Sequence, residues 1–513
     1  MRSFSACLVF LATLACAPTA FGQDDPNVKL MKELYTKIAL NLGVGSNAAV
    51  QGQSYLVLAN PGILLDPTLD YTSPEGRYRL STTIDKVLKP DWIYKTGSNG
   101  TFDVYNNILN YHEAAVVNPT STQKAQYLKA CRLIFTDCDQ KLPGTYTDAY
   151  NRYTDLTNKL ASAAAIAEDY QRINSTAYLP PDIKNNLRVA TQDLNLLGNK
   201  VVIEGALATI NTYEHIDPNA WWGEVQGKLL NNALTYSGNA YGNYNIYPAY
   251  TVWTDLNTTW SKMTLSQSDL ERTTNNSTTT VGGGLSGGFG LWSFGADYNN
   301  TTNRSYYKLD VSGLTVSMEL MRVVLDRPWM DDAVFSSHAW KWLKASPYDG
   351  QLVSDGGDAT NGVTPQGIMP FVQTGLLLAR RVSLSGSWSS DLETSFNSHT
   401  TGGASVGWGP FSFGGRYDNT QSNTYTKAKA AGNTIAWDAP QIIGVFVEVL
   451  PRDPNPNPCY HFASDTQPLP ASCSGTVTAK NIIALRATTG HSASLIKHGQ
   501  ALLAKASHAS SPK

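Results

Sequence analysis

Charged residues are scarce in this sequence. Lys, Arg, Asp and Glu account for 16% of its 513 residues, and the formal net charge at pH 7 is −2. A chain so close to neutral lacks the clustered basic charge that nucleic acid binding requires, so no nucleic acid partner is expected. Asn, Thr, Ser, Gly and Tyr are abundant instead, a balance that is more typical of extracellular β proteins than of cytosolic enzymes.

Long apolar runs are absent after the N-terminus. No later run approaches the ~20 apolar residues of a membrane-spanning helix. The first residues, MRSFSACLVFLATLACAPTAFGQDD, contain one arginine, an apolar run over 6–17 and small residues up to Gly22. This pattern predicts a secretory signal peptide over 1–22 and an exported protein, secreted or periplasmic. A lipoprotein anchor at Cys16 is the alternative, although Thr13 stands where a large aliphatic residue is usual.

Cysteine is also rare, with six in the chain, two of them within the predicted signal peptide. The other four form two pairs that are close in sequence, and an even number in an exported chain favours disulfides. Local pairing is favoured over the two alternatives because short loops close readily. The expected disulfides are Cys131 with Cys138 and Cys459 with Cys473. Neither spacing resembles a zinc site.

Motifs for catalysis or metal binding are lacking as well. The eight histidines are scattered without a metal-binding grouping. GxSxG occurs at 284–288 and 403–407, but a strand-like aromatic run follows each copy, whereas a hydrolase needs a helix there. SDGGDATNG, around Asp355 and Asp358, lacks the regular acidic spacing of a calcium loop, and a connector is favoured. No catalytic residue, metal or cofactor is predicted, and an enzyme with an unrecognised site is the least favoured alternative.

One unusual motif is present twice. GFGLWSFGADYNNT begins at Gly288 and GWGPFSFGGRYDNT begins at Gly407, 119 residues later, with eight of fourteen positions identical. SDLE also stands upstream of both copies. The repetition predicts an internal duplication covering 250–329 and 369–454, and a period this long implies two related domains or half-domains.

Alternation along a strand divides the aromatic side chains of each copy between two faces. One face is predicted to form the core of the duplicated motif, with Trp292, Phe294 and Tyr298 in the first copy and Phe411, Phe413 and Tyr417 in the second. Candidates for contact with a membrane or a cell-surface glycan are Phe289 and Trp408 on the other face, together with Trp221 and Trp222. For the tryptophan-rich patch, interior packing is favoured over such a contact.

The first half of the chain has helical periodicity. The expected helices cover 24–42, 102–112, 123–135, 146–170 and 182–201. Pro180 and Pro181 separate the last two, which predict an antiparallel helical hairpin on the order of 40 Å long. The hairpin is interpreted as the core of a helical domain, or alternatively as a mobile hairpin of the kind that pore-forming toxins carry.

These features together predict an α+β fold. An N-terminal, mostly helical domain is followed by a β-rich region that contains two copies of a related antiparallel β unit. The expected boundaries are 23–215 for the helical domain, 216–345 for the first β unit with its Trp/Tyr-rich lead-in, 346–458 for the second β unit and 459–513 for a disulfide loop and basic tail.

The favoured function is that of a secreted, non-enzymatic protein that interacts with membranes or cell surfaces, with pore formation as one form of this activity. Thr279–Leu291 and Thr400–Gly415 are uncharged and reach the ~9 to 11 residues of a strand that spans a bilayer. The alternative is a secreted binding or structural module that contacts glycans through Trp and Tyr. Membrane lipid or a cell-surface glycan is the expected partner, and assembly into an oligomer is compatible with either function.

Overall fold

The computed structural model describes residues 34, 37–38, 42, 54–88, 93–95, 100–255, 257–266, 268–269, 291–293, 313–357, 365–387, 406–416, 425–427, 429–431, 433–470 and 473. These residues form a mixed α+β structure that combines helices with several antiparallel sheets. The predicted signal peptide, most of the predicted helix 24–42 and the basic tail after 473 lie outside the described residues.

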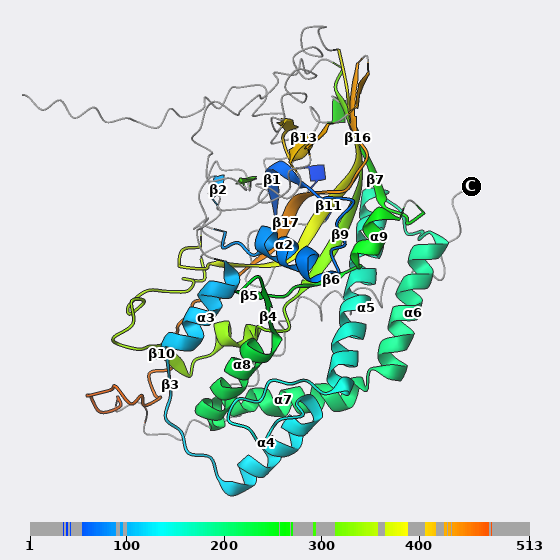
Figure 1. The fold of residues 1–513 in the computed structure, drawn as a ribbon. Helices are drawn as coiled ribbons and strands as arrows, with labels where there is room; N and C mark the ends of the chain where they lie inside the picture. The colour runs from blue at the N-terminus through cyan, green and yellow to red at the C-terminus, as the bar shows by residue number, and fades with distance from the viewer. Residues whose placement is uncertain are drawn as a thin grey trace, which may run out of the picture.

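Eight α-helices belong to the described part of the chain. They are α2 (Pro74–Ile84), α3 (Thr101–Tyr111), α4 (Ser121–Ile134), α5 (Asp148–Ile173), α6 (Pro181–Leu197), α7 (Lys200–Ile216), α8 (Pro218–Asn232) and α9 (Tyr250–Thr254). In Figure 1, α3, α4, α7 and α8 gather at one end of the molecule, and α5 and α6 run side by side along the flank of the sheet.

The helix starts follow capping signals in the sequence. The Thr120 hydroxyl accepts a hydrogen bond from the backbone of Gln123, whose side chain bonds back to Thr120, so α4 begins with a capping box. The Thr147 hydroxyl caps α5 in the same way by accepting from the backbone of Tyr150. α3 and α4 lie within two residues of the predicted helices 102–112 and 123–135.

The predicted hairpin is formed by α5 and α6, but its second helix is shorter than expected. α5 has 26 residues and α6 has 17. The apolar stripe that predicted one helix up to Val201 is interrupted at Gly198, and Asn199 takes a left-handed conformation with φ 47°. α7 therefore begins as a separate helix with a new direction.

Ten strands form the large sheet. They are β1 (Ser54–Leu64), β2 (Ile93–Lys95), β6 (Asn245–Tyr247), β7 (Ser261–Ser266), β8 (Leu291–Ser293), β9 (Thr315–Asp326), β11 (Phe371–Ser385), β15 (Lys429–Ala431), β16 (Thr434–Trp437) and β17 (Gln441–Val449). Their order is β15-β16-β11-β17-β1-β8-β2, and β9 pairs with β11, β6 and β7. β8 is parallel to β1 and β2, and the other pairs are antiparallel. β1 and β17 pair over most of their length although Ser54 and its partner Glu448 stand at opposite ends of the described chain.

Three smaller sheets surround it. β3 (His112–Ala114) pairs with β10 (Trp340–Trp342), β4 (Ala233–Tyr236) pairs with β5 (Asn239–Gly242), and β12 (Val406–Trp408), β13 (Phe411–Arg416) and β14 (Tyr425–Lys427) form the third. A short 3-10 helix, η2 (Asp332–Ser336), leads into β10.

The largest apolar core joins helices and sheet. It includes residues of α2, α3 and α8 together with residues of β1, β9, β11 and β17. Five tryptophans at its centre are almost completely buried, namely Trp221, Trp222, Trp253, Trp329 and Trp340. Large rings remove much apolar area from water, so this cluster is a major source of stability.

The Trp-rich lead-in after residue 216, which was expected to belong to a β unit, is a helix. Asp217 caps α8 by accepting from the backbone of Ala220, and Pro218 occupies its first turn. Trp221, Trp222 and Leu229 lie on its buried side. The aromatic residues favoured a strand by composition, but the helix start signals and the one-sided apolar spacing dominate.

Both predicted disulfides are present. Cys131 at the end of α4 is bonded to Cys138, and Cys459 is bonded to Cys473. The first bond lies in an apolar cluster between α4 and α7. Two disulfides fit an extracellular protein, because such bonds persist in oxidising compartments.

Asp453 is a buried carboxyl group with incomplete hydrogen bonding. It is fully buried, and the Trp340 indole N–H donates to its Oδ1 at 3.1 Å. Its Oδ2 has no hydrogen-bond partner among the described residues. Burial, together with the Glu214 carboxylate, holds the pKa of Asp453 well above its ordinary value. The folded protein therefore binds this proton more tightly than the unfolded chain does. The stability that the Asp453 carboxyl contributes is complete below the ordinary carboxyl pKa, and it is lost as the pH rises through the raised pKa.

Replacing Asp453 with Asn should flatten this pH dependence. The amide oxygen can still accept from Trp340, and no charge is forced into the core at neutral pH. The free energy of unfolding of Asp453→Asn should exceed that of the wild type at pH 8 by on the order of 1 kcal/mol, with a smaller difference near pH 4. Urea unfolding at several pH values measures this. The exposed Asp349→Asn is the control, and parallel profiles for wild type and Asp453→Asn would contradict the assignment.

Candidate functional site

Four neighbouring strands of the large sheet end at the same level. β7, β9, β11 and β16 follow one another in antiparallel order. One row of paired residues crosses all four, with Ser266 opposite Thr315, Thr315 opposite Ser385 and Ser385 opposite Thr434. β7 and β11 end at this row, and the segments that follow them, 267–314 and 386–433, each add a short strand to the same sheet: β8 beside β1 and β2, and β15 beside β16. In Figure 1 this end of the sheet is at the top, beyond β7 and beside β16.

The pairing of β7 with β9 is repeated in the pairing of β11 with β16. Ser266 pairs with Thr315, and Ser385 pairs with Thr434; 385 − 266 and 434 − 315 both equal 119. The next three pairs inward keep the same shift. The aromatic motifs are also 119 residues apart, so strand register and motif repeat with one period.

Part of the second aromatic motif is folded against β1. Trp408 of β12 and Phe411 and Phe413 of β13 are buried, at 5%, 0% and 1% exposure. They belong to an apolar cluster that also contains Leu56 and Leu58 of β1. Apolar side chains of this segment are therefore removed from water in this conformation.

Gln441 attaches β13 to the sheet. Its side-chain Oε1 accepts from the Ser412 backbone N–H at 2.7 Å, and its Nε2 donates to the Ser412 carbonyl at 3.3 Å. The Ser412 hydroxyl donates to the Gly62 carbonyl of β1. A Cβ at Gly62 would lie 2.5 Å from the Pro410 carbonyl oxygen, so this close approach requires glycine.

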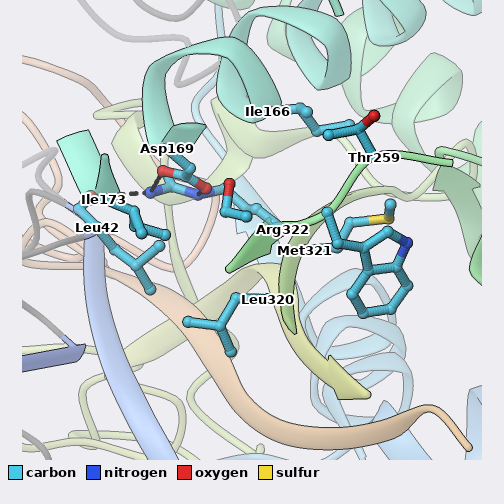
Figure 2. Close-up of a pocket in the computed structure, with 10 residues that line it drawn as sticks. Leu42, Ile166, Asp169, Ile173, Thr259, Leu320, Met321 and Arg322 are labelled. Atoms are coloured by element: carbon cyan, nitrogen blue, oxygen red, sulfur yellow. Dashed lines mark hydrogen bonds and ion pairs between the residues drawn. The ribbon is translucent and has the colours of Figure 1, made fainter. Parts of the chain in front are cut away.

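A buried ion pair joins the helical hairpin to the sheet. Arg322 of β9 donates from Nε and Nη2 to the two carboxylate oxygens of Asp169 in α5, at 3.0 and 2.8 Å. Arg322 also donates to the Leu42 carbonyl and lies 4.3 Å from the Phe446 ring centre. Figure 2 shows Asp169 and Arg322 together in the wall of a small pocket between α5 and the sheet.

This pocket offers little chemistry. Its lining is mostly apolar and includes Leu42, Ile173 and Trp260. Its two charged groups, Asp169 and Arg322, are bonded to each other, so neither is available as a general base or an anion ligand without separating the pair. The pocket therefore marks the junction between hairpin and sheet better than it marks a catalytic centre.

The ion pair between Asp169 and Arg322 is not a strong source of stability for this junction. Burial raises the pKa of Asp169 to about 6, even though Arg322 lowers it. The folded state thus prefers the protonated carboxyl more than the unfolded chain does, and acidification through pH 6 adds stability at this group rather than removing it. The bidentate geometry fixes where α5 lies on β9, which is the role best supported for buried ion pairs.

Side chains at the junction between α6 and α7 are unusually exposed. Leu196, Leu197, Val201 and Val202 have 78%, 53%, 84% and 53% of their surface exposed. This corner lies far from the row of strand ends in Figure 1.

Three of the four candidate contact residues are interior side chains. Trp221, Trp222 and Trp408 are interior side chains, at 0%, 2% and 5% exposure, so they offer no surface for lipid or glycan in this fold. Their indole rings pack in the two large apolar clusters. Phe289 lies outside the described residues. Interior packing therefore applies to these three tryptophans.

The predicted core of the duplicated motif is only partly described. Phe411 and Phe413 are buried as expected. Trp292 lies in β8 beside β1, and only its backbone is described. Phe294, Tyr298 and Tyr417 lie outside the described residues.

Within the described ranges, no group of three or more His, Cys, Asp or Glu side chains is placed to hold a metal ion. No helix among them is both long and apolar enough to cross a membrane. Comparison with known proteins gives no match to a protein-family model, to a curated protein or to a solved structure.

Removing one partner of the Asp169–Arg322 pair should be more damaging than removing both. Asp169→Leu leaves the guanidinium buried without a counter-ion and should lower the free energy of unfolding by about 3 to 5 kcal/mol. The double variant Asp169→Leu, Arg322→Leu should recover most of this loss, because apolar side chains suit the surrounding Leu42 and Ile173. Urea denaturation of the four proteins measures both effects. Equal losses in the single and double variants would contradict a positioning role.

Removing the Gln441 side-chain amide should loosen β13. Gln441→Leu leaves the buried Ser412 N–H and carbonyl unpaired. This should lower the free energy of unfolding by about 1 to 3 kcal/mol. Amide hydrogen exchange of 411–416 should accelerate while that of β9 is unchanged. Gln366→Leu, at a partly exposed position, is the control, and unchanged protection of β13 would argue against this attachment.

Proposed function

We propose that this protein is a secreted, non-enzymatic protein that acts on membranes, and that two related β units deliver the segments 267–314 and 386–433 to the bilayer. The row from Ser266 to Thr434 is the observation that carries the proposal. Two segments that start from adjacent strand pairs at one level can extend the same sheet in the same direction.

The relation between the two units is supported by register. An internal duplication predicts that equivalent strands pair with equivalent partners, and the constant shift of 119 in the β7–β9 and β11–β16 ladders agrees with this. β9 pairs with β11, so in this proposal the two units are neighbours. In this proposal β7 and β9 belong to the first unit, and β11 and β16 belong to the second.

The composition of both segments suits a β-structure in a bilayer. Each has 48 residues (314 − 267 + 1 and 433 − 386 + 1), enough for two strands of the ~9 to 11 residues that span the hydrocarbon region. Thr279–Leu291 and Thr400–Gly415 carry no charge. A closed barrel pairs every backbone group, which is the condition for strands in lipid.

Pro410 is compatible with this arrangement. A proline within a central strand would remove a ladder hydrogen bond. It lies in the turn between β12 and β13, where no ladder donor is needed. In the conformation described, the aromatic residues that would meet lipid pack against β1, and the hydrogen bond of Gln441 holds β13 in place. Membrane action therefore requires β13 to leave β1, and β8 to leave β1 and β2.

Release of dye from liposomes tests the proposal. The mature protein should cause leakage, and Gly287→Asp or Val406→Asp should abolish it, because a charge on a lipid-facing strand is destabilising near the bilayer centre. Ala240→Asp, which adds the same charge to the exposed β4–β5 hairpin, should leak like the wild type.

Folding of each variant is checked by circular dichroism and by urea unfolding. Absence of leakage by the wild type across neutral and anionic lipids, from acidic to neutral pH, would remove the membrane function. A secreted binding module would then be the better interpretation. Leakage by the Asp variants equal to that of the wild type would exclude these segments as the inserting elements.

A further inference from the structure

A lysine and two carboxyl groups meet in the core of the helical end. Lys228 and Glu224 lie one turn apart on α8, and Asp331 directly precedes η2. The Lys228 Nζ lies 2.5 Å from Asp331 Oδ2 and 3.3 Å from Glu224 Oε1. Asp331 is 103 residues from Lys228 in sequence, so this contact connects distant parts of the chain.

The cluster is shielded from water. The side chains of Lys228, Glu224 and Asp331 are 8%, 1% and 14% exposed. The Phe135 ring centre lies 5.7 Å from the ammonium nitrogen. Charged groups are rarely buried to this degree unless they are paired, because removing them from water is costly.

The hydrogen bonds distinguish the two oxygens of Asp331. The Ala333 backbone N–H donates to Oδ1 at 3.0 Å, so this oxygen is held and its carbonyl carbon is polarised. Oδ2 faces the lysine nitrogen. Glu224 is oriented in turn by the Tyr127 hydroxyl, which donates to its Oε2 at 3.2 Å. A nucleophile, an electrophilic carbon with a fixed oxygen, and an acid–base group are thus assembled in one place.

We propose that Lys228 and Asp331 become joined by an intramolecular amide bond in the mature protein, with Glu224 as the catalytic acid–base residue. The lysine nitrogen, once it has passed a proton to Glu224, attacks the carboxyl carbon of Asp331. Glu224 transfers protons from nitrogen to Oδ2, the bond from carbon to Oδ2 breaks, and water leaves. Oδ1 remains as the amide oxygen, bonded to Ala333.

The reaction balances without any further reagent. One ammonium and one carboxylate give one amide and one water molecule, and Glu224 ends in the protonation state in which it began. Proximity replaces chemical activation, since effective concentrations of well-oriented groups reach about 10⁵ to 10⁸ M. Burial raises the pKa of Glu224, which helps it to hold a proton during the exchange. Exclusion of water also opposes hydrolysis of the product.

The chain contains a natural comparison for this cluster. Lys341 Nζ lies 2.5 Å from Asp465 Oδ1 and 3.8 Å from Glu113 Oε2, so the same three residue types meet again. Here Lys341 and Asp465 are 26% and 28% exposed. The Lys341 hydrogen bond lowers the pKa of Asp465. Water that reaches this exposed pair keeps both charges solvated and favours hydrolysis of an amide. This second cluster should remain an ordinary ion pair.

The mass of the intact, reduced protein tests the proposal. Reduction opens both disulfides but leaves an amide intact, so the mass should be lower than that of the mature sequence by one water molecule. Tandem mass spectrometry of a tryptic digest should find a linked pair of peptides that contain Lys228 and Asp331, with no cleavage after Lys228. A mass equal to the sequence, or a loss of water located at another pair of residues, would overturn it.

Variants separate the roles of the three groups. Lys228→Arg and Glu224→Gln should have the full mass, because the first removes the nucleophile and the second removes the acid–base group. Asp331→Asn should still form the link with loss of ammonia in place of water. Lys341→Arg is the matched control and should keep the loss of water. If Lys228→Arg does not fold, the mass and peptide map of the wild type still decide the outcome.

Discussion

The antiparallel pairing of β9 with β11 is the contact on which the rest of the structure depends. β9 carries β6 and β7 on one side, and β11 carries β16 and β17 on the other. Glu319 of β9 accepts hydrogen bonds from Arg380 and Arg381 of β11, at an irregularity in the ladder where Arg381 has φ 49°. Burial raises the pKa of Glu319, but these hydrogen bonds lower it below its ordinary value, so the carboxylate stays charged. Both halves of the sheet, and the hairpin held by Arg322, are positioned by this central ladder.

Local signals predicted α3, α4, α5 and both disulfides well, whereas α2, α7, α8 and α9 were not predicted. Thr120 with Gln123, and Thr147, mark helix starts in the sequence, and α3, α4 and α5 lie close to their predicted ranges. Cys131 and Cys138 needed only a short loop to pair. Errors arose where composition was weighed above position. Trp221 and Trp222 suggested a β lead-in and a contact surface, whereas Asp217 and Pro218 begin a helix that buries both rings.

The functional features depend on contacts that a single sequence does not encode locally. Nothing near Asp169 indicates that Arg322 lies opposite, 153 residues away. Lys228 and Asp331 are likewise ordinary surface residue types until α8 and η2 are packed together. The repeated aromatic motif was visible, but the matching register of β7–β9 and β11–β16 required the sheet. Periodicity identifies elements, whereas long-range pairing determines which side chains become neighbours.

The pairing of β1 with β17 has a consequence for how the chain is made. Ser54 lies opposite Glu448, so the centre of the sheet is closed only after almost the whole polypeptide has been synthesised. Contacts this distant in sequence slow folding and leave apolar strand edges uncovered while the chain is incomplete. A chain shortened before β17 would lack the strand between β1 and β11 and would be a target for proteases and chaperones. In the proposal that this protein is secreted, such late closure is an advantage, because it delays compact structure until translocation is nearly finished.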